Sequence, residues 1–188
     1  MQQPRFRNRA QAGRVLAEAL EAYAGRPDLL VLAPAREGVP VAYEVALALG
    51  APLDVFLAHT PEVPGQPDAV ARRERGYRDG RPPAEIRGRT VVLVDDGLAT
   101  GRTMSAAAAA LRACSPASVL VAVPVGAAES CQAMRRQVAR VVCLFTPEPF
   151  VAVEAYSAEF RETSDAEVRE LLARAARARD GPEALPSL

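Results

Sequence analysis

The chain has 188 residues, of which 49% are hydrophobic and 24% charged, and such a composition suits one globular domain with a full core. Its 23 basic and 23 acidic residues cancel, so nothing in the charge balance indicates a nucleic-acid or membrane partner. All the basic residues are arginine, which excludes P-loop and Schiff-base mechanisms because both need a lysine.

No apolar run approaches the roughly 20 residues of a membrane span, and residues 1–14 are polar and rich in arginine. A signal peptide would need an apolar core there. We therefore expect a cytoplasmic protein.

The first third of the chain alternates helical and strand patterns. Apolar residues recur at helical spacing over Ala10–Tyr23, and the unbroken apolar run Leu29–Ala33 is typical of a strand buried on both faces. A helix over Val39–Leu49 and a strand over Leu53–Ala58 follow. The first helix is expected to cover one face of a sheet.

Residues 59–89 differ in composition, with five prolines, four glycines, many arginines and no sustained apolar period. They predict a long flexible loop or a flap. His59, the single histidine, fits a general acid or base, but an ordinary loop histidine is the better interpretation. Arginines in this segment could bind phosphate or form a solvated face; these are Arg72, Arg73, Arg75 and Arg78.

The central motif begins with the buried strand Val91–Val94, which ends in Asp95 and Asp96. A short loop of small residues leads into an alanine-rich helix over Met104–Arg112. Over Leu98–Thr103, hydroxyls and backbone N–H groups lie at a helix N-terminus, where orphan donors and the helix dipole favour an anion. The motif predicts a phosphate site.

The two carboxylates are placed to accept hydrogen bonds from sugar hydroxyls beside that phosphate, or to orient a hydrated Mg²⁺. A phosphorylated ribose fits both parts of the motif. The alternative is a βα turn with incidental acids, as in phosphate-receiver domains, where a strand also ends in Asp-Asp. The absence of lysine weakens that alternative.

The remaining chain continues the alternation, with a strand over Ser118–Val125, a helix over Ala127–Gln137 and a strand over Val141–Phe145. The residues Ser164 to Glu167 match a capping box and predict the start of a last helix. Residues 180–188 are expected to form a frayed tail. Residues 1–188 thus predict a single α/β domain, a doubly wound parallel sheet of about five strands flanked by helices. We expect the strand order second, first, third, fourth, fifth, with the turns 34–38 and 95–103 meeting at the switch point.

The motif resembles the signature of the type I phosphoribosyltransferase family, and the resemblance extends over Leu29–Leu172. It implies transfer of a 5-phosphoribosyl group from phosphoribosyl pyrophosphate to a nucleobase-like nitrogen, with release of pyrophosphate. Asp95 and Asp96 would contact the ribose hydroxyls. Mg²⁺ would be carried by the substrate without a direct protein ligand, and these two aspartates are the residues that could contact it. The resemblance assigns the 5′-phosphate to Leu98, Ala99, Thr100, Gly101, Arg102 and Thr103, and the pyrophosphate to Ala35, Arg36, Glu37 and Gly38, with Arg36 as a catalytic residue.

A small C-terminal hood over the acceptor is also implied; its residues are Phe150, Ala152, Val153, Tyr156 and Phe160. These aromatic residues could equally close the core. Family members often form dimers, so a homodimer is compatible with the sequence.

Two departures from the family pattern weaken the expectation of catalysis. Glu37 stands where a glycine is usual and puts a negative charge beside a polyanion, and His59 and Thr60 replace an Arg-Lys pair. Two lost charge-assisted hydrogen bonds would remove up to about 6 kcal/mol of stabilisation. The alternative function is therefore a ribose-phosphate or nucleotide binding module that senses and does not transfer.

Overall fold

The computed structural model describes residues 5–34, 36–57 and 67–180. Five parallel strands form one sheet in the order β2-β1-β3-β4-β5. Their bounds are β1 Leu29–Ala33, β2 Leu53–Val55, β3 Thr90–Val94, β4 Ser118–Val125 and β5 Arg140–Phe145. The predicted fold class and strand order are confirmed. The second strand is shorter than predicted, and Ala58 lies outside the described residues.

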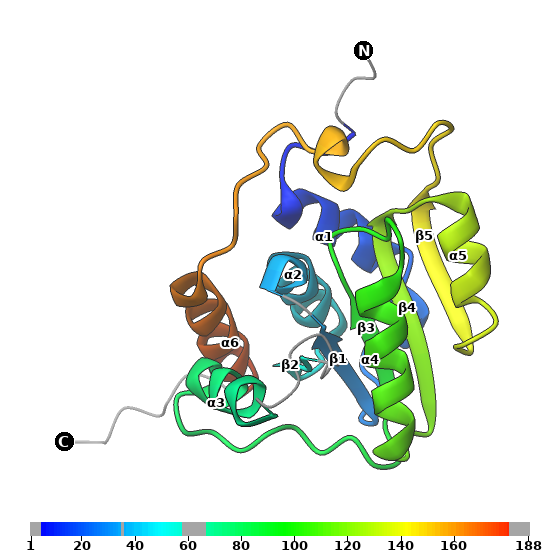
Figure 1. Ribbon diagram of the computed structural model, residues 1–188. Helices are drawn as coiled ribbons and strands as arrows, with labels where there is room; N and C mark the ends of the chain where they lie inside the picture. Colours follow the sequence, from blue (N-terminus) through cyan, green and yellow to red (C-terminus); the bar gives the residue numbers. More distant parts are fainter. Residues whose placement is uncertain (1–4, 35, 58–66, 181–188) are drawn as a thin grey trace.

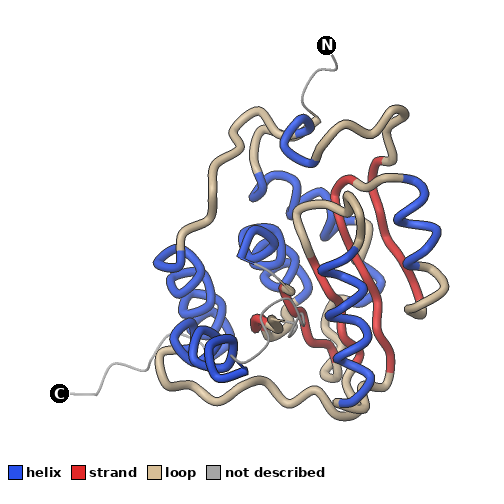
Figure 2. The backbone as a smooth tube through the Cα atoms, viewed as in Figure 1, coloured by secondary structure: helices blue, strands red, loops and turns tan. Residues whose placement is uncertain are grey.

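Helices cover both faces of the sheet (Figures 1 and 2). They are α1 Arg9–Glu18, α2 Val39–Leu49, α3 Pro67–Arg78, α4 Arg102–Ala113, α5 Ala128–Met134 and α6 Asp165–Asp180, with short 3-10 turns η1 Glu21–Tyr23, η2 Arg36–Gly38 and η3 Val153–Tyr156. Leu16, Val45 and Leu172 from α1, α2 and α6 share one core with alternate strand residues. Met104 and Cys131 from α4 and α5 join the core on the other face. None of the described helices is long and apolar enough to cross a membrane.

Local sequence signals set several element boundaries as predicted. Gly50 ends α2 in the left-handed conformation, with φ 65°, which glycine adopts without steric cost. Ser164 accepts a hydrogen bond from Glu167 N at 3.1 Å, so the capping interaction predicted for the start of α6 is present. Val168 and Leu172 then turn into the core.

The flexible loop predicted over 59–89 is wrong for residues 67–78, which form α3. Glu74 of this helix accepts a hydrogen bond from Leu57 N at 2.7 Å, and Arg78 donates to Asp54 at 2.8 Å. Helix α3 is thus anchored by these polar contacts and by the buried ring of Tyr77. A search for apolar periodicity does not detect the polar contacts. His59, Thr60 and the predicted tail from residue 181 lie outside the described residues.

Candidate functional site

The turns after β1 and β3 meet at the carboxyl edge of two neighbouring strands. A Cβ atom on Gly38 would lie 2.7 Å from Asp95 Oδ1 and 2.8 Å from Val94 O, so only glycine allows this approach. The structure therefore brings the 36–38 turn and the acidic pair together, as the strand order predicts. Ala35 lies outside the described residues.

The loop after the acidic pair is fixed at one point and open beyond it. Leu98 is buried, and its backbone donates to Val125 O and accepts from Ala127 N, both at 2.9 Å. The side chains of Ala99, Thr100, Arg102 and Thr103 are exposed, and Gly101 is half-buried with φ 74°.

Among the side chains that the structure describes, none caps the N-terminus of α4; the contact from Arg102 N to Thr100 Oγ1 is long, at 3.5 Å. Apart from Arg102, the first-turn N–H groups of α4 therefore retain their capacity to bind an anion.

The acidic pair is removed from solvent. Asp95 is 9% exposed, the Asp96 side chain is 13% exposed, and Asp95 Oδ1 accepts a hydrogen bond from Asp96 N at 2.9 Å. Burial raises the pKa of Asp95 well above its usual range, and the charge of Asp96 adds to this rise. Burial also raises the pKa of Asp96, while Arg9 opposes the rise. The pair can therefore offer a protonated and an ionised carboxyl group side by side.

Arg9, in the first turn of α1, is the site residue that sequence reasoning missed. Its guanidinium donates from Nε to Asp96 Oδ2 at 2.9 Å and from Nη1 to Arg161 O. Its Nη2 lies 2.9 Å from carboxylate oxygens of both Asp96 and Glu37. The Phe160 ring covers the guanidinium, with 4.1 Å from Cζ to the ring centroid. Arg9 thus joins α1, both turns and the 157–163 segment.

Glu37 does not leave an unpaired charge at the site. In addition to Arg9, its carboxylate accepts a hydrogen bond from Thr163 N at 3.1 Å. The negative charge that departs from the family pattern therefore belongs to an ion-paired cluster. The sequence carries no signal of this pairing, because the partners lie on separate elements.

Arg36, the first residue of the 36–38 turn, contacts a different group of side chains from Glu37. Its Nη1 is 3.4 Å from Asp165 Oδ1, and Arg73 Nη2 of α3 is 3.6 Å from the same oxygen. Tyr77 OH donates to that oxygen at 2.7 Å. Of the arginines singled out in residues 72–78, Arg73 therefore approaches Arg36, whereas Arg78 is buried against Asp54.

The 146–163 segment passes over the top of the molecule from β5 towards α6 (Figure 1). A Cβ atom on Gly97 would lie 2.5 Å from Val153 Cγ2, so η3 rests directly on the central motif. Tyr156 is buried and packs edge-on against Phe145 with 5.8 Å between ring centroids. Tyr156 thus closes a core, whereas Val153 and Phe160 border the site. A cavity of about 490 Å³ lies beside Arg9 and Phe160.

The family model of the phosphoribosyl transferase domain matches residues 6–160. The chain is 37% identical over 210 residues to the Mycobacterium tuberculosis protein "Putative phosphoribosyl transferase MT0597", covering 92% of this chain and 47% of that protein. The chain therefore spans about half the length of this curated relative.

Two solved structures are also similar. The crystal structure of TT1426 from Thermus thermophilus is 35% identical with a TM-score of 0.81, and the match covers 90% of this chain and 98% of that one. Orotate phosphoribosyltransferase from Aeropyrum pernix is 26% identical with a TM-score of 0.50, and the match covers 71% of each chain.

Proposed function

Because the chain belongs to the phosphoribosyl transferase domain family, we propose that it transfers a 5-phosphoribosyl group from phosphoribosyl pyrophosphate to a nitrogen of a base-like acceptor. Pyrophosphate is the leaving group. One observation carries the proposal: the N-terminus of α4, which no described side chain caps, follows a buried acidic pair at the edge where β1 and β3 end.

The residues of the central motif have separate roles in this proposal. Backbone amides and hydroxyls of the 98–103 loop bind the 5′-phosphate, and Asp95 and Asp96 bind the ribose hydroxyls. A carboxyl group with a raised pKa can donate a hydrogen bond as well as accept one, which suits a diol. Arg9 keeps Asp96 oriented through its 2.9 Å contact.

The pyrophosphate is assigned to the 36–38 turn, with Arg36 as its main cation and Arg73 beside it. In the free protein Asp165 pairs with both guanidinium groups. A pyrophosphate group carries more charge than one half-exposed carboxylate, so it can displace Asp165. Arg73 is placed to take over part of the role of the basic residues that the family pattern has near position 59.

Magnesium enters this proposal as part of the substrate. The described residues contain no group of three or more His, Cys, Asp or Glu side chains placed to hold a metal ion. Asp95 and Asp96 fit the task of accepting hydrogen bonds from water on a substrate-bound Mg²⁺. When bound, the ion neutralises charge on the leaving pyrophosphate. The acceptor is assigned to the space beneath the 150–163 segment, beside Phe160.

A pyrophosphate-release assay across purines, pyrimidines and related bases tests the proposal. Turnover is expected for the wild type and for Asp28→Asn, a control whose carboxylate pairs with Arg26 on the exposed surface. Asp96→Asn should lose about 10²-fold or more if Asp96 contacts the reacting sugar. No turnover above the Asp96→Asn level with any acceptor would refute transfer.

A ribose-phosphate sensor is the second candidate, because Glu37 lies in the pyrophosphate turn and Asp96 is already paired with Arg9. Calorimetry separates the two functions. A sensor would bind a nucleoside 5′-monophosphate with little gain from an added pyrophosphate group, whereas a transferase would bind phosphoribosyl pyrophosphate more tightly than ribose 5-phosphate.

A further inference from the structure

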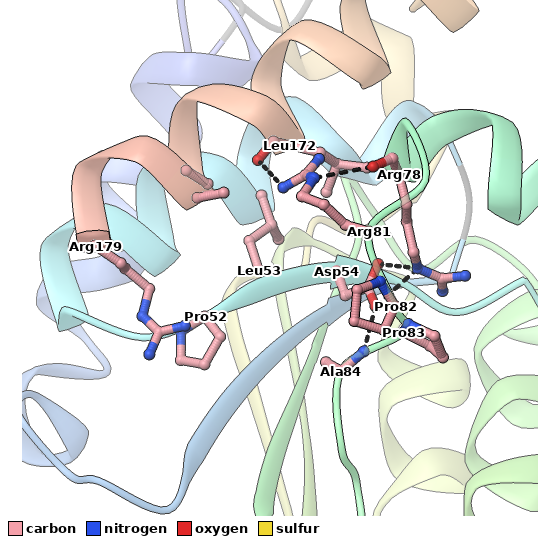
Figure 3. A pocket seen from close by; sticks show the side chains of 12 residues that line it. Pro52, Leu53, Asp54, Arg78, Arg81, Pro82, Pro83, Ala84, Leu172 and Arg179 are labelled. Atoms are coloured by element: carbon pink, nitrogen blue, oxygen red, sulfur yellow. Dashed lines mark hydrogen bonds and ion pairs between the residues drawn. The ribbon is translucent and has the colours of Figure 1, made fainter. Parts of the chain in front are cut away.

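A second cavity, of about 270 Å³, lies at the edge of the sheet beside β2 (Figure 3). Its walls come from the start of β2, the segment after α3 and the last turns of α6. The phosphate-binding loop, in contrast, follows the carboxyl end of β3, and β1 lies between β2 and β3. The cavity is therefore separate from the proposed transfer site. It is lined by Pro52, Leu53, Asp54, Arg78, Arg81, Pro82, Pro83, Ala84, Leu172, Ala175, Ala176 and Arg179.

Asp54 is the single carboxylate in this lining, and it already accepts hydrogen bonds on both of its oxygens. Arg78 Nε donates to both oxygens of Asp54, at 2.8 and 3.0 Å, and both side chains are 8% exposed. Asp54 also accepts from Val55 N at 2.8 Å and from Ala84 N at 2.9 Å. Arg78 and Asp54 therefore neutralise each other, and Asp54 has no remaining capacity to pair with another cation.

Arg81 is held in place without a counter-charge. Its Nε donates to Arg78 O at 2.9 Å and its Nη1 to Leu172 O at 3.2 Å, so both acceptors are neutral carbonyls. Within the described residues its buried Nη2 has no hydrogen-bond partner. Unsatisfied buried donors are uncommon in proteins. Arg81 therefore adds to the cavity wall a positive charge whose described hydrogen-bond acceptors are neutral.

Arg179, in the last turn of α6, adds a second positive charge next to Pro52 (Figure 3). It is exposed, and no carboxylate whose side chain the structure describes forms an ion pair with it. Three arginines and one aspartate give the lining a formal charge of +2. Proline, leucine and alanine side chains form the rest of the wall.

We propose that this cavity binds a compact organic anion, a carboxylate or phosphate group carried on an apolar body. Arg81 and Arg179 supply the charge, since a guanidinium suits both groups, and Leu172, Ala175 and Pro82 contact the apolar part. The volume is just below the range of about 300–1,000 Å³ for drug-sized ligands, which limits the ligand to a small metabolite.

Calorimetric titration tests the proposal with four probes: phenyl phosphate, benzoate, inorganic phosphate and neutral benzyl alcohol. Amide NMR locates the binding, because phenyl phosphate also suits the 98–103 loop. We expect at least one aromatic anion to shift the amides of Ala175 and Ala176. Arg179→Gln should weaken that binding at least about tenfold. Arg177→Gln is the matched control, since Arg177 is 66% exposed on the same helix and pairs with Glu170 at 3.5 Å.

The response to the two aromatic anions identifies the ligand class, and binding of either supports the site. Equal binding of benzyl alcohol, shifts confined to the 98–103 loop, or an unchanged affinity in Arg179→Gln would overturn it. Equal binding of inorganic phosphate would remove the role of the apolar wall. Anion binding here in a protein without transferase activity would leave this site intact and refute only the proposed function.

Discussion

Replacing Arg9 with methionine keeps the aliphatic stem under Phe160 and removes the guanidinium that pairs with Asp96 and Glu37. The Arg9 side chain is 9% exposed, and its partners are 13% and 31% exposed. Removing one member of a buried ion pair costs about 3–5 kcal/mol, because the other charge stays buried. Since Glu37 keeps contact with water, we expect about 3 kcal/mol at pH 8, or a fall in Tm of about 6–12 °C for a chain of this size.

The cost should depend on pH in a definite direction. The charge of Arg9 lowers the pKa of Asp96 and so counteracts the rise that burial causes. Loss of Arg9 therefore raises that pKa further. The variant therefore loses most stability at pH values above the raised pKa, where Asp96 is ionised without a partner. It recovers as the pH falls and Asp96 takes up a proton. Urea unfolding at pH 8 and pH 5 measures the difference.

Arg14→Met is the matched control for Arg9→Met, because Arg14 lies on the same helix and pairs with Glu44 at 3.1 Å while being 53% exposed. An exposed pair of this kind contributes less than about 1 kcal/mol. The double variant Arg9→Met, Asp96→Asn should recover most of the lost stability, since no uncompensated charge remains at position 96. If Arg9→Met costs no more than Arg14→Met, or costs the same at both pH values, the assignment of Arg9 as the central ion-pair residue is wrong.

Asp95→Asn should raise the free energy of unfolding at pH 8 while abolishing transfer, because the raised pKa of Asp95 means that its ionised form destabilises the folded state; the gain should shrink as the pH falls. Asp28→Asn should do the opposite, losing stability at neutral pH, since the pairing of Asp28 with Arg26 lowers its pKa. Gly97→Ala should cost about 1–3 kcal/mol, because its Cβ would meet Val153 Cγ2 at 2.5 Å. Adding Val153→Ala should restore Tm if that contact is the cause, and persistence of the loss would exclude it.

The sheet could be predicted from the sequence because its central strands are buried on both faces. The strands β1 and β3 are fully buried. Leu29–Ala33 and Val91–Val94 are unbroken apolar runs in the sequence. Helix α3 could not be predicted, because Arg78, one of its inward-facing residues, is held by an ion pair with Asp54. An arginine at an inward-facing helical position breaks the apolar periodicity, so the sequence of such a helix is not distinguished from that of a solvated loop.

The same limitation applies to the site. The positions of the acidic pair and of the 98–103 loop follow from the strand-turn-helix order, and the functional roles given to them remain predictions. Arg9 was missed because an arginine near the start of an amphipathic helix is ordinarily solvated, and its partners come from the turns after β1 and β3. Glu37 looked unfavourable for the same reason, since its partner is invisible in the local sequence.

The charge of the site also bears on how it would accept a polyanion. Asp95, Asp96 and Glu37 gather at one edge of the sheet, and within the described residues Arg9 is the cation paired with this cluster. Fully ionised, the cluster would repel a ribose phosphate. Burial raises the pKa of both aspartates, and a nearby phosphate would raise it further. In the proposed complex a retained proton would reduce the repulsion and would supply a hydrogen-bond donor for the sugar.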